Sequence, residues 1–108
     1  MQTPDFLAIG DTVTDVFIRL KDAEAHCDID EHNCKLPFES AEEVPAVGNS
    51  ANAAVAAARL GVHSGLIAHV GKEYHGERIQ ETLMKEGVDT HHLVAHEGIP
   101  TNYHYVLW

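Results

Sequence analysis

Two stretches of the sequence carry side chains suited to holding the hydroxyl groups of a small polar ligand. The first contains Asp15, a carboxylate that can accept hydrogen bonds from two neighbouring hydroxyls. It follows an apolar run that ends at Gly10. The second is the start of an alanine-rich segment, with Gly48, Asn49 and Asn52 close together. The amide of Asn52 offers two donors and one acceptor, which match adjacent sugar hydroxyls.

Each of these side chains also has a purely structural interpretation. Asp11 competes with Asp15 as the ligand-binding carboxylate, and either one can form a turn by bonding to its own backbone. Asn52 can instead cap a helix or cross to a neighbouring loop. Residue type and spacing leave these alternatives open.

The alanine-rich segment predicts a helix with both ends marked. Gly48 can adopt backbone angles closed to other residues, and Asn49 or Ser50 can cap the first turn. Gly61 is a natural stop in the left-handed conformation. A face made of alanine packs close to a sheet, and the free amide groups at a helix N-terminus attract oxygen-rich ligands.

The rest of the pattern predicts an α/β fold. Phe6–Gly10 and Ser64–Val70 are apolar runs typical of buried strands, and the order strand, helix, strand implies a right-handed parallel crossover. Loops beyond the carboxyl ends of such strands form the ligand crevice, where we expect Asp15 and Gly48. The further expected elements are a strand at Val16–Leu20, a loop with one or two short strands at Lys21–Glu43, a helix at about Glu77–Glu86, a strand at His91–Ala95, a turn at 98–101 and a strand at Asn102–Trp108.

Composition narrows the class of protein. The 108 residues suit one small domain, and 17 Asp+Glu against 7 Lys+Arg give a formal net charge of -10. This balance argues against sequence-independent nucleic-acid binding, which depends on basic contacts to phosphate. The sequence has no apolar run of membrane-spanning length, and its first residues lack signal-peptide features, so we expect a cytoplasmic protein without membrane contact.

Ligand types for a metal occur in one acidic segment, at His26, Cys27, His32 and Cys34. Their spacing differs from paired Cys-x-x-Cys knuckles, so we interpret them as reduced loop residues and expect no metal site. A structural disulfide is not expected without a secretory signal. The chain's 9 histidines also lack the helical spacing of a His-Glu-x-x-His motif.

The stretch from Val47 to Gly61 resembles the first signature of the ribokinase-like (pfkB-type) carbohydrate kinases. In that signature a Gly-Gly loop precedes an Asn at a helix start, an alanine-rich helix and Leu-Gly, and Asn52 stands in the place of the Asn. Gly10 and Asp15 fit the family's Gly-x-x-x-x-Asp pattern, which favours Asp15 as the sugar ligand.

Three positions depart from the family pattern. Val13 stands where many sugar kinases of this kind have Asn, and Val47 replaces the first Gly of the pair. The turn that starts at Gly71 resembles the family's Gly-Asp-Asp-x-x-Gly, with Lys72 and Glu73 replacing the acidic pair. The departure at Val13 leaves the identity of the sugar open.

The resemblance covers nearly the whole chain but only the N-terminal third of a family member. It implies an incomplete ribokinase-like (Rossmann-like) parallel sheet with flanking helices and part of a small β lid, all within one domain portion, 1–108. The lid segments would be approximately 16–46 and 99–108. Thr101 and Tyr103 would help to cover the substrate, although Tyr103 and Tyr105 can also simply pack on one face of a strand.

The function implied by the resemblance is that of an ATP- and magnesium-dependent sugar or nucleoside kinase. This chain would contribute the carbohydrate-binding cradle, which consists of Asp15, Gly48, Asn49, Asn52, Thr101 and Tyr103. The family's catalytic Gly-Ala-Gly-Asp motif and nucleotide pocket are expected beyond Trp108, so no catalytic residue, ATP site or Mg²⁺ site is expected here. The chain alone would be inactive.

Two other classes of function stay open. The chain can be a stand-alone, non-catalytic binding or dimerisation module, and a homodimer through the lid is compatible with either class. A dinucleotide-binding oxidoreductase would also use strand, helix, strand, but the first strand is not followed by Gly-x-Gly-x-x-Gly.

Overall fold

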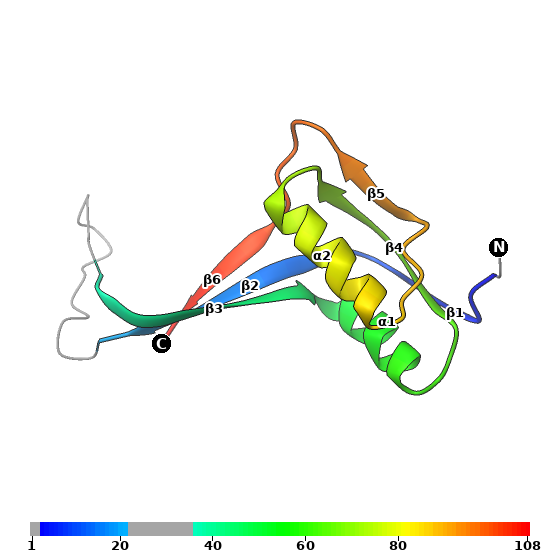
Figure 1. Cartoon of the computed structure of the whole chain (residues 1–108), viewed down its shortest axis with the longest axis horizontal. Coiled ribbons are helices and arrows are strands. Elements are labelled where there is room, and N and C mark those ends of the chain that lie inside the picture. The colour runs from blue at the N-terminus through cyan, green and yellow to red at the C-terminus, as the bar shows by residue number, and fades with distance from the viewer. Residues whose placement is uncertain (1–2, 22–35) are drawn as a thin grey trace.

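The strands of the protein form two three-stranded sheets (Figure 1). The structure is a computed structural model, and it describes residues 3–21 and 36–108. The molecule is elongated, with extents of 53 × 32 × 19 Å. The elements in chain order are β1 (Phe6–Ile9), β2 (Val13–Leu20), β3 (Phe38–Val47), α1 (Asn49–Arg59), β4 (Ser64–Gly71), α2 (Tyr74–Lys85), β5 (Leu93–His96) and β6 (Tyr103–Leu107).

The inner sheet has the strand order β1-β4-β5 and is entirely parallel, which confirms the predicted α/β class. Leu66 and Ala68 of β4 point to the helices and pack with Ala54 of α1 and Ile79 of α2. All four side chains are at most 1% exposed. The small side chains of α1 allow this close approach, because alanine keeps the helix backbone near the sheet.

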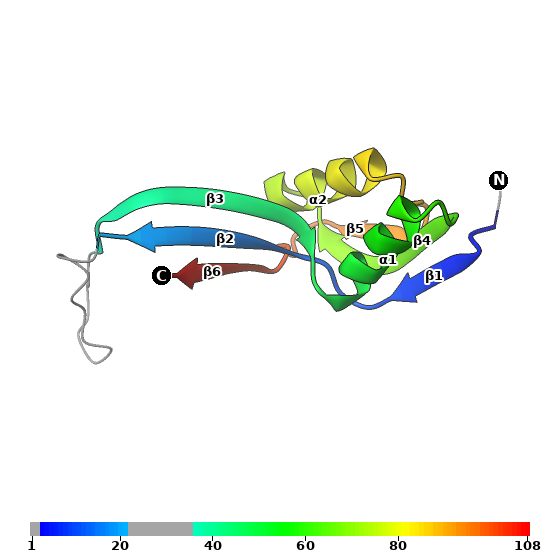
Figure 2. The same cartoon turned by 90° about the horizontal axis from the view of Figure 1, so that it is seen from below.

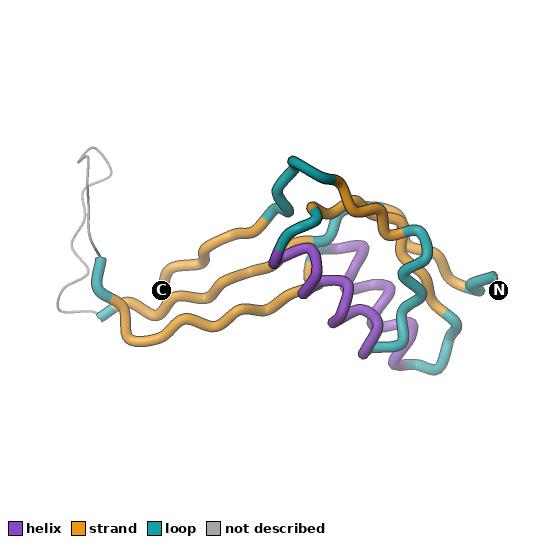
Figure 3. Tube along the Cα trace, turned by 45° about the horizontal axis from the view of Figure 1, so that its top comes forward, coloured by secondary structure: helices purple, strands orange, loops and turns teal. Residues whose placement is uncertain are grey.

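The outer sheet has the order β3-β2-β6 and extends away from the helices (Figures 2 and 3). β2 pairs antiparallel with β3 and parallel with β6. The expected loop with one or two short strands at Lys21–Glu43 does contain a strand in its described part, but the expectation of a short strand was wrong, because β3 has ten residues and continues beyond Glu43, Phe38–Val47. Most side chains of β3 are exposed, so its sequence lacks the apolar and polar alternation that marks a half-buried strand. The strand is stabilised by backbone hydrogen bonds to β2.

Two helix predictions also need correction. Neither Asn49 nor Ser50 caps α1, because Gly48 occupies the N-cap position and no side chain accepts from the first turn. The hydroxyl of Ser50 donates instead to the backbone oxygen of Asp11. The glycine predictions are confirmed, since Gly48 has φ 107° and Gly61 has φ 88°, both in the region that favours glycine.

α2 begins at Tyr74, three residues before the expected Glu77. The carboxylate of Glu73 accepts hydrogen bonds from the backbone N–H groups of His75 and Gly76, at 3.3 and 3.0 Å, and so caps the additional turn. A glutamate is not among the residues that usually mark an N-cap, which explains why the sequence pattern places the helix start too late.

Two further sequence predictions concern a metal site and contact with a membrane. His26, Cys27, His32 and Cys34 lie outside the described residues. Within residues 3–21 and 36–108, neither helix has the length and apolar character needed to cross a membrane.

Candidate functional site

The start of α1 is held by the loop that follows β1. Thr12 Oγ1 donates to the backbone oxygen of Val47 at 3.3 Å, and Ser50 donates to Asp11. A Cβ on Gly48 would lie 3.4 Å from the backbone oxygen of Asp11, an ordinary van der Waals distance, so space alone would admit a side chain there. The positive φ of Gly48 is what favours glycine at this position.

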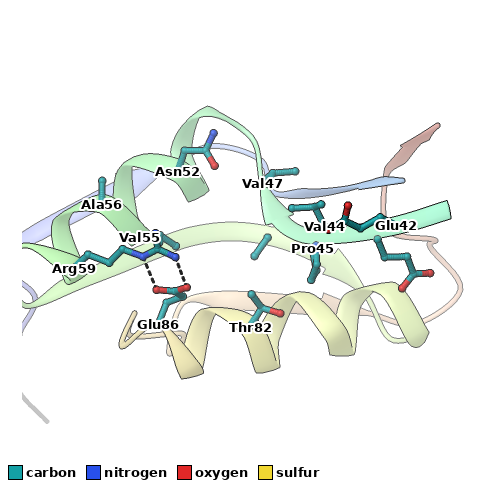
Figure 4. Close-up of a pocket in the computed structure, with 12 residues that line it drawn as sticks. Glu42, Val44, Pro45, Val47, Asn52, Val55, Ala56, Arg59, Thr82 and Glu86 are labelled. Carbon is teal, nitrogen blue, oxygen red and sulfur yellow. Dashed lines mark hydrogen bonds and ion pairs between the residues drawn. The ribbon is translucent and has the colours of Figure 1, made fainter. Parts of the chain in front are cut away.

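Asn49 and Asn52 lie on one exposed side of the first turn of α1, since residues three apart are neighbours on a helix. The Asn52 side chain points away from α2 (Figure 4). The backbone N–H of Asn52 bonds to Gly48 within the helix at 2.8 Å, and its side-chain amide makes no hydrogen bond to the described residues that would fix it as a cap. These two side-chain amides are therefore exposed to solvent.

Asp15 lies on β2, two residues beyond Val13, which pairs with Val47 at the end of β3. Two residues of extended strand span about 7 Å, so Asp15 is about this far along β2 from the position that pairs with Val47, just before α1. Its neighbours in register are Val44 on β3 and His104 on β6, and Asp15 Oδ1 lies 3.3 Å from His104 Nδ1. The carboxylate thus lies between the two edge strands.

The two faces of the outer sheet carry different groups. Thr14 pairs with Tyr103, one position before the pairing of Asp15 with His104. Successive strand residues point to opposite faces, so Tyr103 shares a face with Thr14 and not with Asp15. Its ring stacks on His75 of α2, with centroids 4.6 Å apart. Asp15 and Asn52 are therefore both directed away from α2, whereas Tyr103 is directed toward it.

Thr101 is 4% exposed and its hydroxyl is fully used within the chain. It donates to Glu73 and accepts from the backbone N–H of Gly71, at 2.8 Å. Burial by itself would raise the pKa of Glu73, but hydrogen bonds from Thr101, Gly76 and His75 outweigh burial and lower this pKa below its ordinary value. Glu73 is therefore an ionised acceptor in this network at neutral pH.

Two cavities adjoin these residues without containing Asp15. The larger, of about 520 Å³, lies between α1, α2 and the end of β3, with Asn52 at its rim and the Arg59–Glu86 ion pair on its wall (Figure 4). The smaller, of about 210 Å³, lies at the carboxyl edge of the inner sheet and includes Asp11 and Thr101. In the described part of the chain, Asp15, Asn49 and Asn52 therefore form an open surface and not an enclosed pocket.

The sequence analysis did not identify two residues that contact the candidate site residues, His104 and Glu73. His104 contacts Asp15 only because β6 pairs with β2, and these residues are 89 positions apart. Glu73 was noted only as a departure in the Gly71–Gly76 turn, yet it accepts hydrogen bonds from both α2 and Thr101. The sequence did contain one signal for this role, since Glu73 is an acidic residue two positions before His75, from whose backbone N–H it accepts a hydrogen bond.

Residues 7–107 match the family model described as pfkB family carbohydrate kinase. The nucleoside kinase of Methanothermobacter thermautotrophicus is 31% identical over 99 residues, which are 90% of this chain and 30% of that protein. The 2-dehydro-3-deoxygluconokinase of Thermoproteus tenax is 39% identical over 59 residues, 55% of this chain and 18% of that protein.

The fold is similarly shared with the ribokinase of Arabidopsis thaliana, solved in complex with ribose and ATP. The TM-score is 0.83 at 18% identity, over 98% of this chain and 32% of the ribokinase. The chain thus spans a third or less of the length of these relatives. With a family match over nearly all of its residues and a ribokinase-like fold, the chain belongs to the pfkB family of carbohydrate kinases.

Proposed function

We propose that the protein containing this chain is an ATP-dependent kinase acting on a hydroxyl of a sugar or nucleoside, and that this chain supplies the sugar-binding cradle. The cradle consists of Asp15 on β2 with Gly48, Asn49 and Asn52 at the start of α1. The observation that carries the proposal is the uncapped N-terminus of α1 next to the strand pair that holds Asp15. Donors on one side and a carboxylate on the other suit neighbouring hydroxyls.

The names of the relatives include kinases for nucleosides, a deoxy sugar acid and ribose. The proposed substrate class is therefore a sugar or nucleoside with neighbouring hydroxyl groups. Val13 and Val47 pair at the end of the β2–β3 ladder, but Val13 is only 5% exposed, so it packs inside the fold and adds little apolar surface beside the carboxylate.

Thr101 and Tyr103, also expected from the sequence to cover the substrate, are assigned supporting roles in this proposal. The Thr101 hydroxyl is bonded to Glu73 and Gly71, and the Tyr103 ring is stacked on His75. Direct contacts to the sugar from β6 would come from the opposite face, which carries His104.

The turn at the start of α2 does not fit a nucleotide phosphate. The first amides of α2 already bond to the Glu73 carboxylate, which would repel a phosphate. A Cβ on Gly76 would lie 1.9 Å from the oxygen of Gly71, so this turn is filled by its own backbone. No group of three metal-ligating side chains occurs within residues 3–21 and 36–108. We therefore propose that ATP and Mg²⁺ bind to another part of the complete protein.

The test is ADP formation by the complete protein with a panel of sugars and nucleosides. Asp15→Asn should raise KM for the accepted substrate about tenfold or more, since hydrogen bonds to charged groups are worth about 1.5–3 kcal/mol. Asn52→Ala should raise KM about fivefold, since a hydrogen bond between neutral groups is worth about 1 kcal/mol. Asp11→Asn is the matched variant, because Asp11 is the competing carboxylate. If Asp11→Asn raises KM and Asp15→Asn does not, the cradle is wrongly assigned.

A non-catalytic binding or dimerisation module is the second candidate. Phe17 of β2 and Val106 of β6 pair in register on the face that carries Asp15, and they are 37% and 38% exposed. Two such faces, from two copies of the chain, can cover each other. Sedimentation of the chain would then report a dimer that Val106→Lys dissociates, and a monomer at all concentrations would exclude the dimerisation module.

A further inference from the structure

Three consecutive side chains at the start of α2 contact the outer sheet or the turn that leads into it. Glu73 bonds to Thr101, just before β6. Tyr74 donates its phenolic O–H to Glu43 of β3 at 2.9 Å. His75 stacks on Tyr103 of β6, with an angle of 28° between the rings. We call Glu73, Tyr74 and His75 the α2 mount.

The bond between Glu73 and Thr101 belongs to a closed network. Glu73 Oε1 accepts from the N–H groups of Gly76 and Thr101, at 3.0 and 3.2 Å, and also from the Thr101 hydroxyl. The same hydroxyl accepts from the N–H of Gly71, the last residue of β4. One carboxylate and one hydroxyl therefore join α2, the inner sheet and the chain entering β6.

Close packing makes this junction stiff. A Cβ on Gly71 would lie 2.2 Å from the backbone oxygen of Ile99, and a Cβ on Gly76 would lie 1.9 Å from the oxygen of Gly71. Both atoms are backbone, which cannot move aside as a flexible side chain can. The backbone at Ile99 is thus packed directly against Gly71 at the end of β4, and Gly71 is packed directly against Gly76 of α2.

The mount contacts the face of the outer sheet opposite Asp15. Glu43 and Tyr105 both pair in register with Val16, and Tyr103 pairs with Thr14, so these residues share the face toward α2. β2 lies between β3 and β6, both of which the mount holds. The height and tilt of β2, and with it the position of Asp15 relative to Asn52, therefore depend on the mount.

We propose that Glu73, Tyr74 and His75 are positioning residues for substrate binding, which set the distance between the Asp15 carboxylate and the start of α1 without touching the substrate. The proposal rests on the proposed sugar cradle. It adds to the cradle three residues at the start of α2 that do not contact the substrate, and it makes Thr101 the hydrogen-bond partner of the mount residue Glu73.

The experiment uses the complete protein and the variants Tyr74→Phe, Thr101→Val and Thr101→Ser. Tyr74→Phe removes one hydrogen bond and keeps the ring, and Thr101→Val keeps the shape but loses the hydroxyl. Glu86→Gln is the matched control, because Glu86 lies at the opposite end of α2 from the mount and bonds to Arg59 of α1, not to the outer sheet. Two readouts are taken, hydrogen exchange of the β6 amides and the steady-state kinetics of sugar phosphorylation.

We expect Thr101→Val to speed exchange of β6 and to raise KM for the sugar about fivefold with kcat within twofold, and Tyr74→Phe to do the same more weakly. Thr101→Ser should restore both readouts, and Glu86→Gln should change neither. Faster exchange with unchanged KM would overturn the positioning role. Unchanged exchange would overturn the mount itself. A parent protein without sugar phosphorylation would instead defeat the cradle, and its exchange data would still report whether the mount holds β6.

Discussion

His104 on β6 places its Nδ1 atom 3.3 Å from Oδ1 of Asp15 on β2. The Asp15 side chain is 29% exposed and that of His104 is 62% exposed, so the pair is open to solvent. An imidazole on one carboxylate oxygen leaves the second oxygen for a ligand and limits rotation of the carboxylate. His104 can thus orient the Asp15 carboxylate, which is the group proposed to bind the sugar.

His104→Ala in the complete protein should raise KM for the sugar roughly fivefold, because losing an orienting hydrogen bond is worth about 1 kcal/mol. His104→Asn retains a donor and should have a smaller effect. A double-mutant cycle with Asp15→Asn supplies the control. If the two substitutions add without coupling, His104 does not act through Asp15.

Gly76→Ala should destabilise the protein by about 2 kcal/mol or more, although alanine normally favours a helix over glycine by about 1 kcal/mol. The reason is the position of the new Cβ, 1.9 Å from the backbone oxygen of Gly71. Urea unfolding is the measurement. Glu77→Ala, at the next and exposed position, should stay within about 0.5 kcal/mol of the parent. Equal stability of the two variants would contradict the packing described at this turn.

Stability should fall at acidic pH in part through Glu73. Its pKa in the folded protein is lowered, so its contribution is complete above the unfolded-state pKa of about 4.3 and is lost as the pH falls through the lower folded-state value. Glu73→Gln should flatten the decrease in unfolding free energy below about pH 4.3. An unchanged pH profile in Glu73→Gln would show that the carboxylate is not the acceptor of these bonds.

Glu86 offers the comparison for that experiment. The hydrogen bond from Arg59 lowers the pKa of Glu86, and the same bond raises the pKa of Arg59. This pair lies at the surface, where ion pairs contribute little. Glu86→Gln should therefore flatten the acid profile less than Glu73→Gln does.

Thr14→Val should stabilise the protein by roughly 1 kcal/mol. Thr14 is 1% exposed, and its hydroxyl has no hydrogen-bond partner among the described residues. An unpaired buried hydroxyl lowers stability, while valine keeps the β-branched shape that suits a strand. The midpoint of thermal unfolding measures the difference. Thr12→Val is the control, because the Thr12 hydroxyl donates to Val47 and this variant should therefore be less stable than the parent. A lower midpoint for Thr14→Val would reveal a partner for this hydroxyl.

Local patterns in the sequence determined the inner sheet, the extent of α1 and the family. The apolar runs that became β1 and β4 are buried on the helix-facing side, and alanines with glycine at either end specify α1. These features depend on residues near one another in the chain, so composition and spacing are sufficient to predict them.

The outer sheet and the surroundings of the proposed cradle were decided by tertiary structure. β3 forms because β2 supplies its hydrogen-bond partners, and α2 starts early because Glu73 turns back onto its first amides. Tyr103 faces His75 and leaves the position beside Asp15 to His104, since a strand alternates its faces and only the register with β2 selects which residue lies there. Pairings between distant segments have no signature within either segment, so only the folded chain reveals them.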